Sequence, residues 1–201
     1  NLPKTNVWNG VYNLQNQTYS KQGIYYIDPN LSGQSGQSGN TLYTYSSSGG
    51  SFGVNANNGT LIIGNDTESA NTKGLIQFGG IKWWNGGDVG YITGTYDAAN
   101  IYLTSHLKTG NSYADGGGAT LNFNATNNLT INQASLDNSH AGTQKSYMNF
   151  KGSNIKVSGS SFKDDTDGGF SFSGNSNNST ISFNQTNFNQ GTYNFSNSAS
   201  S

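Results

Sequence analysis

Residues 128–136 read NLTINQASL, residues 154–162 read NIKVSGSSF, and residues 180–188 read TISFNQTNF. The three stretches start at residues 128, 154 and 180, which is a period of 26 residues. Each stretch is apolar at its second, fourth and ninth positions: Leu129, Ile131 and Leu136; Ile155, Val157 and Phe162; Ile181, Phe183 and Phe188. A fixed period of this length is typical of stacked repeat architectures.

A second apolar pattern precedes each of these stretches. It consists of two apolar residues separated by one position: Leu121 and Phe123, Met148 and Phe150, Phe170 and Phe172, with Tyr193 and Phe195 after the third stretch. Each repeat is therefore predicted to contain three short strands of period 2, separated by turns. Upstream, Ile101 and Leu103 lie 28 residues before Leu129 and Ile131, and pairs near residues 61 and 76 are earlier candidates.

These patterns predict an all-β parallel β-helix with three short strands and about 26 residues per coil. Equivalent apolar residues would form columns, one through Leu129, Ile155 and Ile181. The connection between the second and third strands is constant in length and should form a tight, buried corner. The connection between the first and second strands varies, so it should project outward as the place where partner contacts vary. We expect residues 59–201 to form the β-helix, continuous with an irregular or capping β region over residues 1–58.

The composition excludes several classes of protein. The chain has 201 residues, no Cys, a formal net charge of −1, and 9% charged residues. All nine basic residues are scattered Lys, so no basic patch favours nucleic acid. No apolar run approaches 18 residues, so no membrane insertion is expected. The ends of the sequence suggest a fragment of a larger protein, and an open β-helix end should favour end-to-end self-association.

One acidic cluster is a candidate metal or acid–base site. Asp164, Asp165 and Asp167 follow Phe162 within the string KDDTDGG. Such turns can hold calcium or supply general acid–base groups, and residues 165–168 resemble one short motif of the polygalacturonase family. That family's other elements are missing, and the chain has no Arg to clamp an acidic sugar. We interpret the cluster as a solvated turn, with calcium as the alternative, and expect neither a catalytic residue nor a cofactor.

Two further groups of residues have side chains that can bind a ligand. Trp83 and Trp84 adjoin a Gly-rich segment and could stack on a sugar ring, although core packing is the alternative role. His106 and His140 lack the spacing of metal ligands, so we expect them to be solvent-exposed or locally bonded.

The residues from Ala119 to Asn132, together with the phrases at 148–155 and 181–185, resemble passenger domains of bacterial autotransporters. Within that group they are most similar to the vacuolating-cytotoxin-like family of gastric bacteria. The resemblance covers roughly residues 59–201 and carries over no functional residue. It implies a right-handed β-helix that is exported across the outer membrane, displayed at the bacterial surface or secreted, and active in colonisation, adhesion or toxicity. The apolar pore-forming segment of the cytotoxin has no counterpart here.

Two functions follow as hypotheses. The first is a non-enzymatic passenger fragment that presents loops to a host-cell or bacterial-surface component. The alternative is a carbohydrate-active β-helix, such as a polysaccharide lyase, a glycosidase or a tailspike-like protein, which would need two carboxylates on neighbouring rungs. A stalk without any ligand is the third interpretation.

Overall fold

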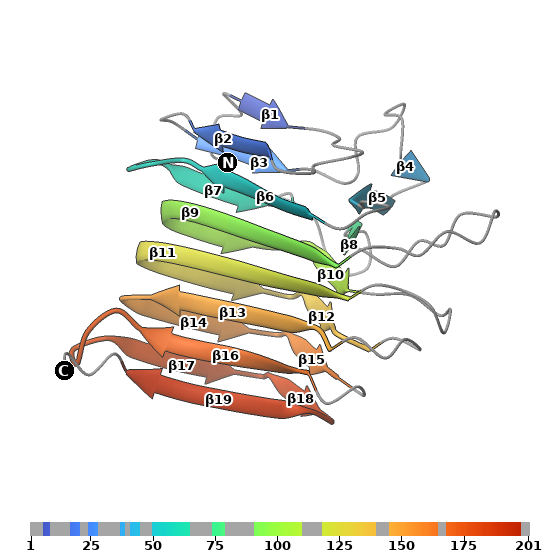
Figure 1. Cartoon of the computed structure of the whole chain (residues 1–201). Coiled ribbons are helices and arrows are strands. Elements are labelled where there is room, and N and C mark those ends of the chain that lie inside the picture. The colour runs from blue at the N-terminus through green and yellow to red at the C-terminus, as the bar shows by residue number, and fades with distance from the viewer. Residues whose placement is uncertain are drawn as a thin grey trace.

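The computed structural model describes residues 51–64, 74–78, 91–109, 118–139, 145–164 and 168–197, together with the backbone of short strands between residues 6 and 50. All the described elements are strands, and no described helix has the length and apolarity needed to cross a membrane. The strands stack as successive rungs of a β-solenoid (Figure 1). The predicted all-β parallel β-helix is confirmed.

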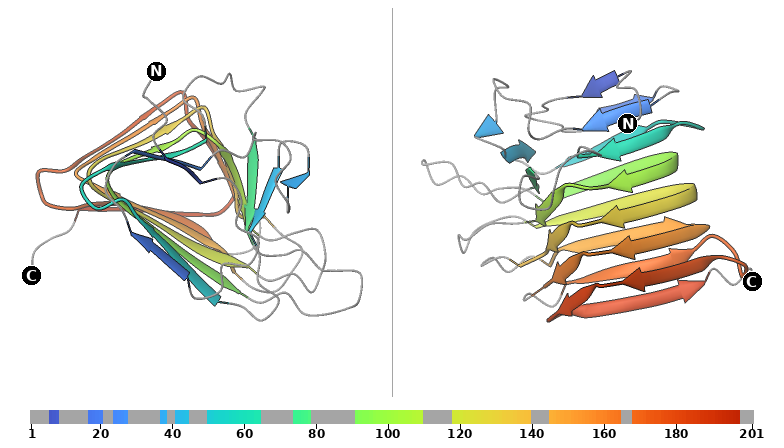
Figure 2. Two further views of the ribbon diagram at one scale, coloured as in Figure 1. Left: turned by 90° about the horizontal axis from the view of Figure 1, so that it is seen from above. Right: turned by 180° about the vertical axis from the view of Figure 1, so that it is seen from behind.

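Each rung has three sides, and the outline seen along the stack is a triangle (Figure 2). The first and second sides belong to one sheet and the third side to another. The first and second sides contain β6 (Gly50–Asn55), β7 (Thr60–Ile63), β9 (Ile92–Leu103), β11 (Ala119–Asn132), β13 (Tyr147–Gly152), β14 (Asn154–Ser158), β16 (Gly169–Gly174), β17 (Thr180–Asn184) and β19 (Thr192–Asn197). The third side contains β5 (Thr41–Thr44), β8 (Leu75–Phe78), β10 (His106–Thr109), β12 (Ser135–Asp137), β15 (Ser161–Lys163) and β18 (Asn187–Asn189).

The strand register confirms the predicted columns. Leu129 pairs with Ile155, and Ile155 pairs with Ile181, along the second side. On the third side Leu136 pairs with Phe162, and Phe162 pairs with Phe188. Pairing is parallel at each of these steps, and Ile101 and Leu107 extend the two columns upstream. The repeat in the sequence is therefore a repeat in space.

An aromatic stack fills the interior behind the first side. The rings of Tyr96, Phe123, Phe150, Phe172 and Phe195 lie parallel, with successive centroids 5.0, 5.2, 5.1 and 5.4 Å apart. This spacing follows the rung spacing of about 4.8 Å, so identical positions on adjacent rungs place their rings face to face. Such pairs contribute about 0.5–1.5 kcal/mol each beyond the burial of their area.

The predicted turn between the first and second strands takes different forms along the stack. In β9 and β11 the chain passes from the first to the second side as one strand, with a register shift between Ala125 and Asn128. The two sides are separate strands before β9, as β6 and β7, and again from β13 onward. The expectation of three separate strands in every rung is therefore wrong for β9 and β11, because a bent strand can keep its ladder through this corner.

The N-terminal strands continue the stacking. They are β1 (Asn6–Trp8), β2 (Gln17–Ser20), β3 (Ile24–Ile27) and β4 (Gln37–Ser38). Parallel pairs join β1 to β3, β3 to β7, and β2 to β6, whereas β4 and β5 pair antiparallel. The β6 strand, which precedes residue 59, pairs in parallel with β9. The strand ladder is therefore continuous across residues 58 and 59, and the proposed division between two regions at this point stays a prediction.

Candidate functional site

The three corners of the coil differ in what they can offer to a partner. We call the junction of the first and second sides the first corner, the junction of the second and third sides the second corner, and the junction of the third side with the next rung the third corner. The second corner is closed, the third is filled by buried polar groups, and the first carries a groove.

The second corner is tight and buried, as predicted, between β11 and β12 and between β14 and β15. Gln133, Gly159 and Gln185 occupy equivalent positions with φ of 49°, 57° and 49°. The next residue points inward, and Ala134 and Ser160 are both 2% exposed. The Ser160 hydroxyl donates to the Ser158 carbonyl at 2.9 Å and accepts the Ala134 N–H at 3.2 Å. The rungs from β11 onward share this left-handed residue, which explains why their connections have the same length. The corner between β7 and β8 differs, because eleven residues, 64–74, separate these two strands.

The third corner contains a column of buried polar side chains. Thr109, Asn138 and Asp164 occupy equivalent positions at the ends of β10, β12 and β15, and none is more than 1% exposed. The Thr109 hydroxyl donates to Asn138 Oδ1 at 2.8 Å, and Asn138 Nδ2 donates to the Gly169 carbonyl at 3.0 Å. These bonds tie adjacent rungs together where the apolar columns end.

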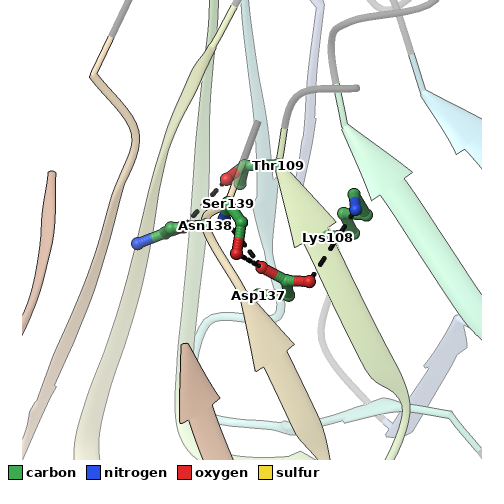
Figure 3. A network of polar contacts seen from close by, with 5 residues as sticks. All are labelled: Lys108, Thr109, Asp137, Asn138 and Ser139. Atoms are coloured by element: carbon green, nitrogen blue, oxygen red, sulfur yellow. Dashed lines mark hydrogen bonds and ion pairs between the residues drawn. The ribbon is translucent and has the colours of Figure 1, made fainter. Parts of the chain in front are cut away.

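Figure 3 shows how neighbouring residues divide between the inside and the outside of this corner. Asp137 lies on the outer surface, where its Oδ2 is 3.7 Å from Lys108 Nζ on the preceding rung. Its Oδ1 accepts the Ser139 N–H at 2.7 Å and also the Ser139 hydroxyl. Thr109 and Asn138, one residue further along each strand, form the inner contact. The outer ion pair is exposed enough to contribute at most about 1 kcal/mol.

Asp164, the described member of the predicted acidic cluster, is buried rather than solvated. It is 1% exposed, and its N–H donates to the Gln190 carbonyl at 3.3 Å. A Cβ added at Gly168 would lie 2.9 Å from Asp164 Oδ2. The interpretation as a solvated turn is therefore wrong for this residue, because its place in the column turns it inward. Asp165 and Asp167 lie outside the described residues.

Tyr193 closes this corner at the last described rung. Its single O–H donor lies among three carbonyl acceptors, those of Phe162, Asn189 and Gln190, at 3.1, 2.7 and 3.0 Å. Burial and the negative charge of Asp164 together raise the pKa of Tyr193 to about 12. Thr109, Asn138 and Tyr193 therefore use their polar atoms for internal bonds, which is a structural role.

The remaining predicted candidates do not assemble into a site. Trp83, Trp84 and His140 lie outside the described residues. His106 is half-buried, and its Nδ1 accepts the Ser135 N–H at 2.9 Å, which is the local bonding expected of it. Within the described ranges, no three His, Cys, Asp or Glu side chains gather closely enough to hold a metal ion.

The first corner is hollowed by an open groove of about 680 Å³. Five rungs contribute to its walls, and the described lining residues are Asn55, Asn57, Asn58, Asp97, Ala98, Asn124, Ala125, Thr126, Lys151 and Asn175. The groove lies at the corner that the sequence marks as variable. Its volume is within the range of small-molecule sites, but its walls are far more polar than is usual for them.

Small inward residues give this corner its shape. Ala56, Ala98, Ala125, Gly152 and Gly174 follow the aromatic column and are all buried. A larger side chain at these points would push the wall outward; a Cβ on Gly174, for example, would lie 2.5 Å from Ser179 Cβ. The chain can therefore bend sharply, which leaves space outside the bend.

Hydrogen bonds between rungs hold the polar walls in place. Asn124 Nδ2 donates to Asp97 Oδ1 at 2.9 Å, across adjacent rungs. At the far end, Asn175 Nδ2 donates to the carbonyls of Ala125 and Thr126 at 2.9 and 3.1 Å, which lie two rungs away. These contacts fix the side chains before any ligand arrives, so binding would require little further ordering.

The sequence alone did not identify this set of residues, although a signal for part of it is present. Asn55, Asp97, Asn124 and Lys151 are successive register partners on the first side. Each directly follows an apolar residue of the first strand, namely Val54, Tyr96, Phe123 and Phe150. Aligning the rungs by those apolar residues would have collected these four side chains into one row.

Comparison with known proteins gives one finding. Neither the curated proteins nor the solved structures contain a match to this chain. A family model described as "Putative vacuolating cytotoxin" matches residues 87–146, a segment that includes β9 to β12. Over residues 87–146 the chain is thus similar to the vacuolating-cytotoxin family, which confirms for this segment the resemblance that the sequence predicts.

Proposed function

We propose that the chain is a non-enzymatic, toxin-like β-helical segment that is secreted or displayed at a bacterial surface, as the passenger of an autotransporter. In this role it contributes to colonisation or adhesion by contacting a host-cell or bacterial-surface component. The observation that carries the proposal is the similarity of residues 87–146 to vacuolating cytotoxins.

The outer surface of the coil supports a scaffolding role. Asn128 Nδ2 donates to Asn100, Asn154 Nδ2 donates to Asn128, and the Thr180 hydroxyl donates to Asn154, so one polar ladder spans four rungs. Such ladders use uncharged side chains to connect rungs while remaining compatible with water. A rigid stack of this kind can hold corners and loops at fixed spacings.

Binding rather than catalysis is proposed for the groove. Asp97 is the one carboxylate among its described lining residues, and its register partners are Asn55 and Asn124. Glycoside hydrolysis uses two carboxyl groups about 5–9.5 Å apart. A carbohydrate-cleaving enzyme is the second candidate, favoured by the presence of a polar groove of suitable size. Incubation with polysaccharides and measurement of new reducing ends tests it, and product formation that Asp97→Asn abolishes would support cleavage.

Two experiments test the proposed function. The chain, fluorescently labelled, is added to cultured epithelial cells and to bacteria, and saturable binding that unlabelled chain competes is the expected result. Linear, non-competed uptake on both surfaces would contradict it. For the autotransporter assignment, the complete reading frame is sequenced and its product is fractionated. A signal peptide, a C-terminal barrel segment and surface exposure are expected, and a cytoplasmic product without either segment would contradict the assignment.

The expected end-to-end self-association stays a prediction. On the last described rung, Phe188 and Phe195 are 40% and 52% exposed, although their equivalents Phe162 and Phe172 are fully buried. A rung stacked on this end would bury both rings.

A further inference from the structure

We infer that the first-corner groove is a binding site for an extended, neutral, hydroxyl-rich glycan that lies along the axis of the solenoid. The inference rests on the proposed role in surface contact and names the chemical class of the partner. It follows from the kind of side chains in the walls, from their spacing and charge balance, and from the pairing of the strands that carry them.

The side chains of the walls suit hydroxyl groups. Half of the described lining residues are Asn, whose primary amide presents a donor and an acceptor on one planar group. One amide can therefore donate to one sugar hydroxyl and accept from its neighbour. Asn57 and Asn58 are exposed at one end of the groove, Thr126 is exposed at its centre, and Asn175 lies at the other end. Described lining residues include no aromatic or large aliphatic side chain. A peptide held by apolar anchors would find no pocket of the kind such anchors fill.

The charge of the groove favours a neutral ligand. Asp97 and Lys151 are the charged residues among its described lining residues, so their formal charges cancel. A polyanion such as a sulfated glycan or a nucleic acid would require several cations in the wall. A polycation would require several carboxylates.

The backbone of the walls excludes recognition by strand addition. Asn55, Asp97, Asn124 and Lys151 are consecutive register partners, so the strands that carry them are already paired on both sides within the groove. A peptide that binds as an extra strand needs an open sheet edge. The groove therefore offers side chains rather than main-chain groups.

The spacing of the wall groups favours a polymer over a single sugar. Parallel rungs are about 4.8 Å apart, so the row from Asn55 to Lys151 extends over roughly 14 Å. The row offers one polar side chain per rung in a fixed line. A chain molecule with regularly spaced hydroxyl groups can bond several rungs at once, whereas a monosaccharide can bond only one or two.

The test uses neutral hexasaccharides as probes: β-1,4-linked glucose, α-1,4-linked glucose and β-1,4-linked N-acetylglucosamine, each titrated against the chain by calorimetry. A heparin-derived hexasaccharide serves as the polyanionic comparison. At least one neutral probe should bind, and its monosaccharide should bind at least tenfold more weakly. Absence of binding by all three neutral probes, or binding of the heparin fragment alone, overturns the inference.

Variants locate the site. Thr126→Trp places a large ring in the groove from an exposed position, and Asn124→Leu keeps a similar volume while removing the amide. Both should weaken the neutral probe at least tenfold. Lys156→Trp, which is exposed on the second side outside the groove, is the matched control and should leave binding unchanged. Full binding by both groove variants overturns the assignment of the site.

The same variants separate this inference from the proposed function. If labelled Thr126→Trp binds cells as well as the parent chain while glycan binding is lost, the groove is a glycan site that does not mediate surface contact. If neither the parent nor the variant binds cells but the glycan titration succeeds, the proposed function fails and the glycan inference stands.

Discussion

The second corner and the first corner turn the same chain by different means. At the second corner, left-handed residues such as Gln133 and Gly159 make the turn, and buried Ala134 and Ser160 fill it. At the first corner, small inward residues such as Ala125 and Gly152 permit a bend, and the space is left outside as a groove. From β11 onward, the corner closed by its own atoms keeps its length, whereas the corner open to solvent changes length and leaves space for a ligand.

The largest expected effect comes from a charge placed in the column between the two corners. Ile155 is fully buried and pairs with Leu129 and Ile181, so Ile155→Asp should lower the free energy of unfolding by on the order of 4 kcal/mol. Its exposed neighbour provides the control, Lys156→Asp, which should change stability little. Chemical denaturation measures both, and equal stability of Ile155→Asp and the parent would show the column assignment to be wrong.

Enlarging one residue at each corner tests the contrast directly. Ser160→Leu adds volume to a buried position and removes the hydroxyl that bonds Ser158 and Ala134, so a loss of about 3 kcal/mol is expected. Ser176→Leu, at an exposed position beside the groove, should cost less than about 0.5 kcal/mol. Comparable losses in thermal unfolding would mean that the two corners are equally closed.

In the rungs from β11 onward, insertions should be tolerated at only one of these two corners, although residues 64–74 lengthen the second corner between β7 and β8. Two glycines inserted after Asn177, in the exposed loop of the first corner, should lower stability by less than about 1 kcal/mol. The same insertion after Gln133 separates the left-handed residue from the buried Ala134 and should cost at least about 2 kcal/mol. The midpoints of urea unfolding give the comparison, and a tolerated insertion after Gln133 would remove the explanation offered for the constant length of that corner.

The smallest effect concerns a pair of non-glycine residues with positive φ, one taken from each corner. Gln133 has φ of 49° and Asn57 has φ of 52°. Asn accepts this conformation more readily than Gln, so Gln133→Gly should stabilise the fold by about 0.5 kcal/mol, and Asn57→Gly should give no gain. Calorimetric melting temperatures measure the difference, and a gain only in Asn57→Gly would reverse the proposed order of strain.

The repeat allowed much of the fold to be predicted from the sequence. Apolar residues at equivalent positions, such as Leu129, Ile155 and Ile181, had to form a column, because a parallel stack places identical positions above one another and buries them only in that register. The tight second corner of the three 26-residue repeats could be predicted because the spacing between their second and third strands is the same. The bent, uninterrupted strands β9 and β11 could not be predicted, since a strand and a turn can use the same polar residues at an open corner.

The candidate site was less predictable than the fold. The acidic cluster is a candidate site in the sequence because three carboxylates lie close together. In the structure, Asp164 is buried in a column with Thr109 and Asn138. The groove, in contrast, collects residues separated by tens of positions, such as Asn55, Asp97 and Lys151.

The sequence by itself determined the period, the apolar columns and the class of fold, because these depend on burial that recurs along the chain. Only the tertiary structure decided which polar residues share a surface, which lie inside, and where the coil leaves space. The placement of these polar residues depends on how neighbouring rungs align at each corner. A few residues inserted or lost in one connection change that placement without changing the apolar repeat.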